Sequence, residues 1–328
     1  MTSAGEVTVI IPQWNRAELL AILLKHLSLQ TYPIHRTIVV DNGSTDNSSA
    51  VAKAFGSQVI SLTNNHGFAF AVNRGIEAAT TEWIAILNND VTLEQTWLQE
   101  ILTEASARGA WFGVGKLLSS VTGRIDGTFD LISAGSTAWR CGSDRPDVPL
   151  WSKTRPIQLA PMTAAIFRRE LFTRVGLLDE RFGSYLEDVD LGLRCSAAGL
   201  AGVYVPAARG THMGSATRGA WHKATVQQIS RNQIFISSKH FRGAPLWKIL
   251  VAQLLWGLVA LRHRTAGAWL AGKWQGLRQG SAIRGEEGSW GRIRESVERS
   301  EREIYEFQRS AGFDSYWRWY FMLTGGTR

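Results

Sequence analysis

The most concentrated group of titratable residues in the chain is an acidic cluster. Glu187, Asp188 and Asp190 fall within four positions, between apolar residues and at the expected start of a helix. A helix N-terminus stabilises anions, so capping is one interpretation for one of the three, and it suits Asp190 best. A carboxylate within hydrogen-bond reach of a hydroxyl can also act as a general base. We assign that role to Asp188 and expect Glu187 and Asp190 on the side that binds the hydroxyl-bearing acceptor.

Carboxylates and amides also follow two apolar runs. Asp41 ends one run, and Asn88, Asn89 and Asp90 end another. An ionised carboxylate accepts hydrogen bonds without donating, so Asp41 suits the imide of a base or the hydroxyls of a ribose. Asp90 beside a diphosphate could hold Mg²⁺ or Mn²⁺, which prefer oxygen ligands and share them with phosphates. Because these segments are also rich in turn formers, turns and helix caps remain the alternative.

Further candidates for nucleotide binding surround these carboxylates. Gly67 allows a close approach of the backbone, and Asn73 and Arg74 on the helix after it could address a ribose or pyrophosphate. Helix caps and a solvated arginine are the alternative. The other candidates follow the first apolar run or precede that helix, and they are Pro12, Trp14, Asn15, Arg16, Asn64 and Phe68.

Two common nucleotide-binding signatures are missing. The turn after the first apolar run is Pro-Gln-Trp-Asn-Arg-Ala, without the glycines of a dinucleotide-binding G-x-G-x-x-G turn. The chain also has no phosphate loop ending in Gly-Lys-Ser/Thr. The sequence therefore gives no support for dinucleotide-dependent chemistry or for hydrolysis of ATP or GTP.

The elements that must position these residues begin with a βαβ pattern. Residues 7–11 and 37–40 are apolar without alternation, which is typical of parallel strands buried on both faces, and residues 17–29 between them carry leucines at helical spacing. Ligands bind beyond the carboxyl ends of such strands. The pattern continues through a helix at 48–54, a strand at 58–62, a helix at 70–79 and a strand at 83–87. It predicts the nucleotide-binding half of a doubly wound, mostly parallel α/β sheet.

The second half of the sheet domain has weaker signals. Residues 113–161 are rich in Gly, Ser, Asp and Pro, which predicts loops and short strands on the acceptor side. Regular patterns return at a strand (163–167), two helices (169–175 and 189–198), a strand (202–205) and a helix (224–240).

Cysteine content and the start of the chain indicate a compartment. Cys141 and Cys195 are the only cysteines and form no CxxC pair, which excludes a disulfide framework and a cysteine zinc site. No basic segment followed by a long apolar run opens the sequence. We therefore expect a cytoplasmic protein.

The tail from residue 241 is basic and rich in tryptophan. It holds 14 Lys+Arg against 8 Asp+Glu, and seven of the 14 tryptophans. Its longest uncharged stretch, residues 249–261, has 13 residues, short of the roughly 20 that span a bilayer. Tryptophan beside basic residues predicts peripheral membrane contact, with a core between helices or a dimer seam as the alternative. Nucleic-acid binding is not expected, because no recognisable binding motif accompanies the arginines.

Taken together, the motifs resemble glycosyltransferase family 2 with the glycosyltransferase A fold, over about residues 6 to 240. In their residue sequences these motifs resemble the rhamnosyltransferase-like branch of that family. The segments that carry the resemblance are IIPQWNR, VVDNGSTDNS, NNHGFAFAVNRGI, LNNDV, GLLDERFGSYLEDVDLGLR and a later TH.

The resemblance implies roles for individual residues. Asp41 would contact the base of the nucleotide, and Asn88 to Asp90 would fill the Asp-x-Asp position. Asp188 would be the general base of the reaction, and His212 would complete the metal site. A lone histidine is otherwise structural or exposed more often than it is a ligand. One departure is Asn88, which replaces the first Asp of Asp-x-Asp, so Asp90 alone can ligate there as a carboxylate.

The resemblance also implies the activity and the domain layout. It implies inverting transfer of a sugar, with rhamnose favoured, from a UDP- or dTDP-sugar to a glycan or lipid-linked glycan of the cell envelope. A catalytic domain at 1–240 would comprise a nucleotide half at 1–112 and an acceptor half at 113–240, followed by a helical tail at 241–328. The alternative is a non-catalytic nucleotide-sugar-binding protein of the same fold, for which Asn88 is the one hint.

Overall fold

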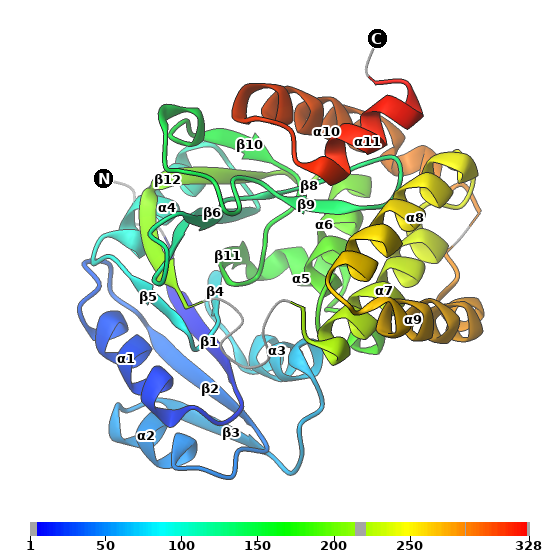
Figure 1. The fold of residues 1–328 in the computed structure, drawn as a ribbon. Helices are drawn as coiled ribbons and strands as arrows, with labels where there is room; N and C mark the ends of the chain where they lie inside the picture. Colours follow the sequence, from blue (N-terminus) through cyan, green and yellow to red (C-terminus); the bar gives the residue numbers. More distant parts are fainter. Residues whose placement is uncertain (1–4, 214–220, 286, 327–328) are drawn as a thin grey trace. The chain divides into compact units, whose positions relative to one another are not determined.

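The computed structural model describes residues 5–213, 221–285 and 287–326. Within these ranges the chain forms two compact units, one of residues 5–129 and 140–213 and the other of residues 130–139 and 221–326. Figure 1 shows the strands of the first unit and the helices that dominate the second.

Ten of the described strands build one mixed sheet in the first unit, with β10-β12-β6-β11-β4-β1-β2-β3 as its main order. Strands β3, β2, β1 and β4 are parallel, whereas β11 runs antiparallel between β4 and β6. The strands are β1 Val7–Gln13, β2 Arg36–Asn42, β3 Gln58–Leu62, β4 Trp83–Leu87, β5 Val91–Leu93, β6 Phe112–Ser119, β7 Ile125–Gly127, β10 Arg155–Ile157, β11 Ala164–Arg168 and β12 Gly202–His212.

Helices cover both faces of this sheet, as a doubly wound α/β fold requires. Alternate residues of β1, such as Val9 and Ile11, share a buried cluster with α1 and α4. The other face meets α3, where Gly75 lies so close to Ile10 that a Cβ would stand 2.4 Å from its side chain. The helices of this unit are α1 Ala17–Ser28, α2 Ser48–Ala54, α3 Phe68–Ala78, α4 Trp97–Ala107, α5 Arg169–Val175, α6 Glu187–Ala197 and the short η1 Pro149–Trp151 and η2 Glu180–Phe182.

One strand contradicts the expectation of loops and short strands at residues 113–161. Strand β6 has eight residues and lies between β11 and β12. Its sequence hides this position, because Gly115 faces the backbone of Ala208 and Lys116, 1% exposed, has its ammonium 2.6 Å from Asp147. Glycine and lysine weaken the apolar pattern by which buried strands are predicted.

The second unit pairs a small hairpin with a set of helices. They are β8 Asp130–Ile132, β9 Ala138–Arg140, α7 Lys223–His240, α8 Leu246–Arg262, α9 Ala266–Gln279, η3 Gly280–Ile283, α10 Ser289–Ala311 and α11 Ser315–Thr324. Helix α7 packs on α9, where Gly272 and Gly276 face the carbonyl oxygens of Gln227 and Arg231. This division differs from the predicted limit at residue 240, because that packing joins α7 to the tail helices. No helix in the described ranges has the length and apolarity of a bilayer span.

Candidate active site

The carboxyl ends of β1, β2 and β4 meet at one edge of the sheet. Gln13 pairs in register with Asp41, and the side-chain amide of Asn89 donates to Gln13 Oε1 at 2.8 Å. Gln13, which is fully buried, also donates to Ser48 Oγ at 2.8 Å. The segment after β4 is thereby tied to the ends of β1 and β2. Gln13 was not among the predicted site residues, although a polar residue that ends an apolar strand is a usable signal.

Asp41 is held in the turn that follows β2. Its carboxylate accepts hydrogen bonds from the backbone N–H of Ser44 at 2.9 Å and from the hydroxyl of Ser49. Asp41 is 6% exposed. The turn interpretation is therefore correct for its local contacts, and its place at the strand end is the one required for a base or ribose contact.

The turn after β1 has an unusual backbone. Asn15 and Arg16 both adopt left-handed conformations, with φ of 56° and 63°. The side-chain oxygen of Asn15 accepts from the backbone N–H of Thr45 at 2.8 Å, which ties this turn to the one after β2. Left-handed non-glycine residues cost roughly 1–3 kcal/mol each and cluster at functional sites. Pro12 and Trp14 flank Gln13 in the same segment and stay predicted donor contacts.

The start of α3 brings the distant acidic segment to this edge. Gly67, at φ 91°, lies against Gly183, and the N–H of Ala69 donates to Gly183 O at 2.9 Å. The N–H of Phe68 donates to Ser184 Oγ at 3.2 Å. A Cβ at position 67 would stand 3.0 Å from Gly183 O, so this approach needs glycine. Asn64, just before it, is exposed and remains a predicted donor contact.

Asn73 does not fit its predicted role as a ligand. It is 2% exposed, and its amide donates to Leu178 O at 2.9 Å and accepts from Leu178 N at 3.0 Å. Its polar atoms are used to fasten α3 to the segment before η2. Arg74 is partly exposed and forms ion pairs with Glu77 at 3.0 Å and Glu180 at 3.3 Å, so a phosphate would have to compete with two carboxylates.

Asp90 and His212 are neighbours. Strand β12 runs on to His212, which pairs with Val91 of β5, and Met213 N donates to Asp90 O at 3.0 Å. His212 Nε2 lies 3.2 Å from Asp90 Oδ1, and Nδ1 lies 2.9 Å from Asp126 Oδ2. Burial alone would lower the pKa of His212, but hydrogen bonds to Asp126 and Asp90 raise it to about 9.

The donor set of this pair fits a divalent metal that is shared with a substrate. Among the described residues, no three His, Cys, Asp or Glu side chains are arranged to hold an ion by themselves. Asp90 and His212 offer one carboxylate oxygen and one imidazole nitrogen, and diphosphate oxygens would complete a shell suited to Mn²⁺ or Mg²⁺. Metal binding at His212 must displace its proton. Asp126, which no sequence motif marks, orients the ring from its other nitrogen.

The acidic cluster divides into three environments. Asp188 has a side chain 14% exposed, and its carboxylate accepts from Val189 N at 2.8 Å and lies 3.4 Å from Met162 N. Glu187 is 5% exposed, and one of its carboxylate oxygens is buried without a hydrogen-bond partner. Burial, and then the nearby charge of Asp188, raise the pKa of Glu187 well above its usual value.

Asp190 does not fit the predicted acceptor-side role. It is fully buried and pairs with Arg194 at 3.0 Å. The guanidinium of Arg194 also donates to Leu177 O at 2.9 Å, so the pair fastens α6 to the segment after α5. The carboxylate therefore points into the protein, and its role is structural.

The segment beside Asp188 adjoins the end of β4. Met162 N lies at the Asp188 carboxylate, and the next residue, Thr163, accepts from Asn88 N at 2.9 Å. The guanidinium of Arg140 contacts both sides of this junction. One of its nitrogens lies 3.9 Å from the Asp188 carboxylate, and another donates to Thr163 Oγ1 at 3.3 Å. A reachable carboxylate thus stands beside the Asn88 to Asp90 segment, which is the convergence that the motifs predicted.

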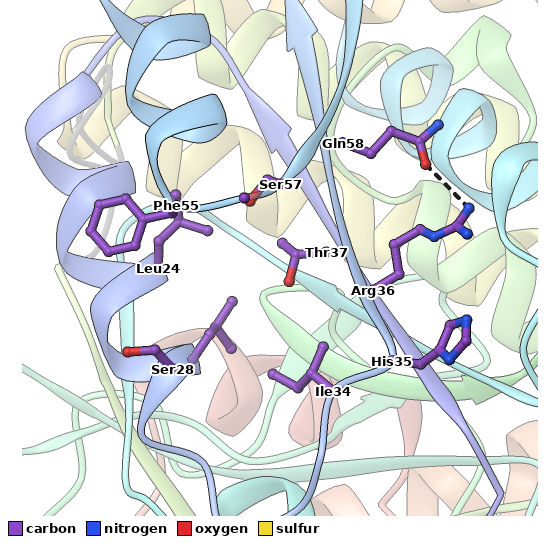
Figure 2. Close-up of a pocket in the computed structure, with 11 residues that line it drawn as sticks. Leu24, Ser28, Ile34, His35, Arg36, Thr37, Phe55, Ser57 and Gln58 are labelled. Atoms are coloured by element: carbon purple, nitrogen blue, oxygen red, sulfur yellow. Dashed lines mark hydrogen bonds between the residues drawn. The ribbon is translucent and has the colours of Figure 1, made fainter.

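A separate depression of about 550 Å³ lies at the opposite edge of the sheet. Figure 2 shows it between α1 and the starts of β2 and β3, with Arg36 donating to Gln58 Oε1 at 3.3 Å. Leu24 and Phe55 are among its lining residues. Because ligands of parallel sheets bind at the carboxyl ends of strands, we do not assign the donor site there.

The sequence resembles those of known proteins. Residues 8–123 match the family model described as glycosyl transferase family 2. The O-antigen biosynthesis protein RfbC of Myxococcus xanthus is 31% identical over 66% of this chain, although the match spans only 18% of RfbC. An N-acetylglucosaminyl-diphospho-decaprenol L-rhamnosyltransferase of Mycobacterium tuberculosis is 27% identical over 73% of this chain and 85% of its own length. An uncharacterized glycosyltransferase of Mycobacterium bovis is 32% identical over 60% of this chain and 82% of its own.

Two solved structures share the fold. A mannosyltransferase from Pyrobaculum calidifontis, in complex with GDP-Man and Mn²⁺, has a TM-score of 0.54 and 18% identity over 98% of this chain and 87% of its own. GalNAc-T7 with UDP, GalNAc and Mn²⁺ has a TM-score of 0.62 and 12% identity over 98% of this chain and 57% of its own. These likenesses confirm the expected glycosyltransferase A fold. With the family match and the relatives, they establish that this chain is a glycosyltransferase of family 2, in the rhamnosyltransferase-like branch.

Proposed function

We propose that this chain transfers a sugar from a UDP- or dTDP-sugar to a hydroxyl of a cell-surface or lipid-linked glycan, with inversion at the anomeric carbon. Rhamnose is the favoured sugar, because one relative is named an L-rhamnosyltransferase acting on a decaprenol-linked substrate and another is named for O-antigen biosynthesis. In this proposal residues 1–112 bind the nucleotide of the donor, and residues 113–240 bind the acceptor and supply His212 to the metal. The reaction takes place on the cytoplasmic side of the membrane.

The observation that carries the proposal is the setting of Asp188. Its carboxylate is partly exposed and is held by backbone N–H groups beside the segment bonded to Asn88. As general base it takes the proton of the acceptor hydroxyl while that oxygen attacks the anomeric carbon. The bond from that carbon to the diphosphate breaks in the same displacement, and a single displacement inverts the configuration. Burial, and then the nearby charge of Asp188, raise the pKa of Glu187, which favours its neutral form beside the base.

At the donor end, Asp90 and His212 would hold the divalent ion. When bound, such an ion neutralises charge that develops on the departing diphosphate. Asp126 fixes the ring of His212 by accepting from Nδ1, so that Nε2 faces Asp90. Asp41, an acceptor of hydrogen bonds at the end of β2, contacts the base or ribose.

The test is donor consumption by the Asp188→Asn variant. We expect turnover to fall by roughly 10²- to 10⁴-fold, the usual contribution of a general base, while the nucleotide sugar still raises the melting temperature. Glu104→Gln is the matched control and should keep full activity, because Glu104 of α4 is a surface residue paired with Arg108, just past the end of that helix, at 2.8 Å. Turnover within a few-fold of the wild type would exclude Asp188 as the base.

A non-catalytic binding protein is the second candidate, and Asn88 in the Asp-x-Asp position is the observation that favours it. It predicts that the unmodified chain is stabilised by a nucleotide sugar but never consumes one. Measuring both quantities on the same preparation, with Mn²⁺ and an acceptor present, separates the two candidates.

A further inference from the structure

Helix α8 exposes a row of leucines along its length. Leu246, Leu250, Leu254, Leu258 and Leu261 are 54–65% exposed. Their separations of four, four, four and three residues place them on one face of the helix, over roughly 22 Å at 1.5 Å per residue. Trp247, 49% exposed, borders the same face. A helix of 17 residues thus presents five of its leucines and Trp247 to the outside.

These leucines are not the residues that pack α8 into its own unit. That task falls to a different set, in which Ala252 and Ala260 are fully buried and Gly257 receives the ring of Trp269 from α9. A helix that is apolar on its exposed as well as its buried face needs a second apolar partner.

Helix α9 continues the pattern. Leu270, Trp274 and Leu277, separated by four and three residues, are 58–65% exposed. Contiguous exposed apolar surface of this kind marks a site of interaction with a protein or a membrane. We refer to these three residues, with the five exposed leucines of α8 and Trp247, as the α8–α9 apolar face.

The charges around this face indicate what kind of partner it binds. No acidic residue occurs from residue 242 to residue 285, whereas the exposed arginines in the same stretch are Arg262, Arg264, Arg278 and Arg284. The guanidinium of Arg278 lies 5.9 Å from the ring of Trp274, at the edge of the face. Two copies of this chain meeting through the face would bring cation to cation, because a two-fold interface juxtaposes the same surface. An anionic lipid surface supplies hydrocarbon for the leucines and phosphates for the arginines.

We propose that the α8–α9 apolar face is a membrane-docking surface that seats in the headgroup layer of anionic phospholipids. It lies wholly within the second unit and does not depend on the chemistry at Asp188. It deepens the proposed function, because a lipid-linked acceptor is presented at such a surface.

Flotation with lipid vesicles tests the docking surface. The purified chain should float with phosphatidylcholine vesicles that contain phosphatidylglycerol, and much less with phosphatidylcholine alone. The double change Leu254→Glu and Leu258→Glu should lower the bound fraction at least about 10-fold, since it adds charge at the lipid-facing side. Ile22→Glu is the control, because Ile22 is an exposed apolar residue of α1, 45% exposed, in the other unit.

The arginines provide an independent variant that leaves the apolar face intact. Arg262→Gln with Arg264→Gln should reduce binding to phosphatidylglycerol vesicles and make the remaining binding less sensitive to salt, since Arg278 and Arg284 are still present. The same thermal unfolding midpoint as the wild type checks that each variant is folded. Absence of wild-type flotation would overturn the proposal. So would a wild-type dimer in solution that the leucine changes convert to a monomer without affecting vesicle binding.

The docking surface and the proposed reaction can fail separately. With a water-soluble acceptor, the leucine variant should keep wild-type turnover, whereas Asp188→Asn should lose turnover and still float. A leucine variant that floats as well as the wild type would reject the docking surface whatever its activity.

Discussion

Removing the carboxylate of Asp126 should weaken metal-dependent turnover without touching the donor or acceptor. Asp126 accepts from His212 Nδ1 at 2.9 Å, and its side chain is 20% exposed. A hydrogen bond to a charged partner contributes about 1.5–3 kcal/mol, and about 1.4 kcal/mol is a factor of ten. Because Asp126 is partly solvated, we expect the lower part of that range. Asp126→Ala should therefore raise the Mn²⁺ concentration for half-maximal turnover by about 10- to 30-fold.

The assay is donor consumption as a function of Mn²⁺, with the unmodified chain, Asp126→Ala and Asp126→Asn compared. The asparagine can still accept from Nδ1 but carries no charge, so its Mn²⁺ requirement should lie between the other two. Asp144→Asn is the control, because Asp144 belongs to the same segment of the chain and its side chain is 87% exposed. An unchanged Mn²⁺ requirement in Asp126→Ala would refute a role for Asp126 in orienting His212.

Three further predictions concern stability. Gly67→Ala should lower the free energy of unfolding by about 1–3 kcal/mol, measured in urea, and weaken donor binding, because a φ of 91° and the contact with Gly183 admit no Cβ. Asp190→Asn should lower the free energy of unfolding by about 3–5 kcal/mol, because the largely buried Arg194 loses its counter-charge, and an unchanged melting temperature would contradict this. Burial lowers the pKa of Lys273 from 10.5 to about 7, so the unfolded chain binds more protons between those values and stability should rise with pH across that window, by at most about 5 kcal/mol. Lys273→Met should flatten this pH dependence of urea unfolding, and an identical slope in the variant would exclude Lys273 as its source.

The parallel part of the sheet could be predicted because its strands are uniformly apolar. Strands β1, β2 and β4 are almost entirely buried, and the runs at residues 7–11, 37–40 and 83–87 carry that pattern directly. The turns after them could be placed as well, because ligand-binding residues of open parallel sheets follow the strand ends. Helices α2 and α5 have the predicted limits.

Strand β12 shows where the local pattern failed. The predicted strand stops at residue 205, yet β12 continues to His212 through a register shift between Tyr204 and Arg209. Pro206 and Arg209 interrupt the apolar run, so the extension depends on pairing with β5 and β6, which a local window cannot contain. The same long-range pairing sets His212 beside Asp90.

Side-chain roles were harder to predict than positions in the chain. The motifs bring Asp188 and the segment from Asn88 to Asp90 to one place, but they do not distinguish a ligand from a fastening residue. Asn73 and Asp190 belong to the same motifs, but their side chains bond to Leu178 and Arg194. Asp126 carries no signal, because it meets His212 from 86 positions away.

Membrane contact of the tail stays a prediction, and most of the exposed apolar residues there are leucines. The prediction rested on tryptophans beside basic residues, yet Trp290 and Trp317 are 8% and 3% exposed and pack within the second unit, whereas Trp247 and Trp274 belong to the α8–α9 apolar face. Leucines on α8 form most of the exposed face instead. A leucine in this 13-residue uncharged run could lie in the core or on the surface, and the sequence does not say which. The packing of α8 shows which of its residues are buried and which are exposed.

The central claim is that the carboxyl ends of β1, β2 and β4, together with Asp188, form one sugar-transfer site. A crystal structure of the Asp188→Asn variant with dTDP-rhamnose and Mn²⁺ tests it most directly. We expect the metal at Asp90 and His212, the diphosphate on that metal, and the anomeric carbon on the side of residue 188. Donor bound in the depression lined by Leu24 and Phe55, or metal held away from His212, would contradict the assignment.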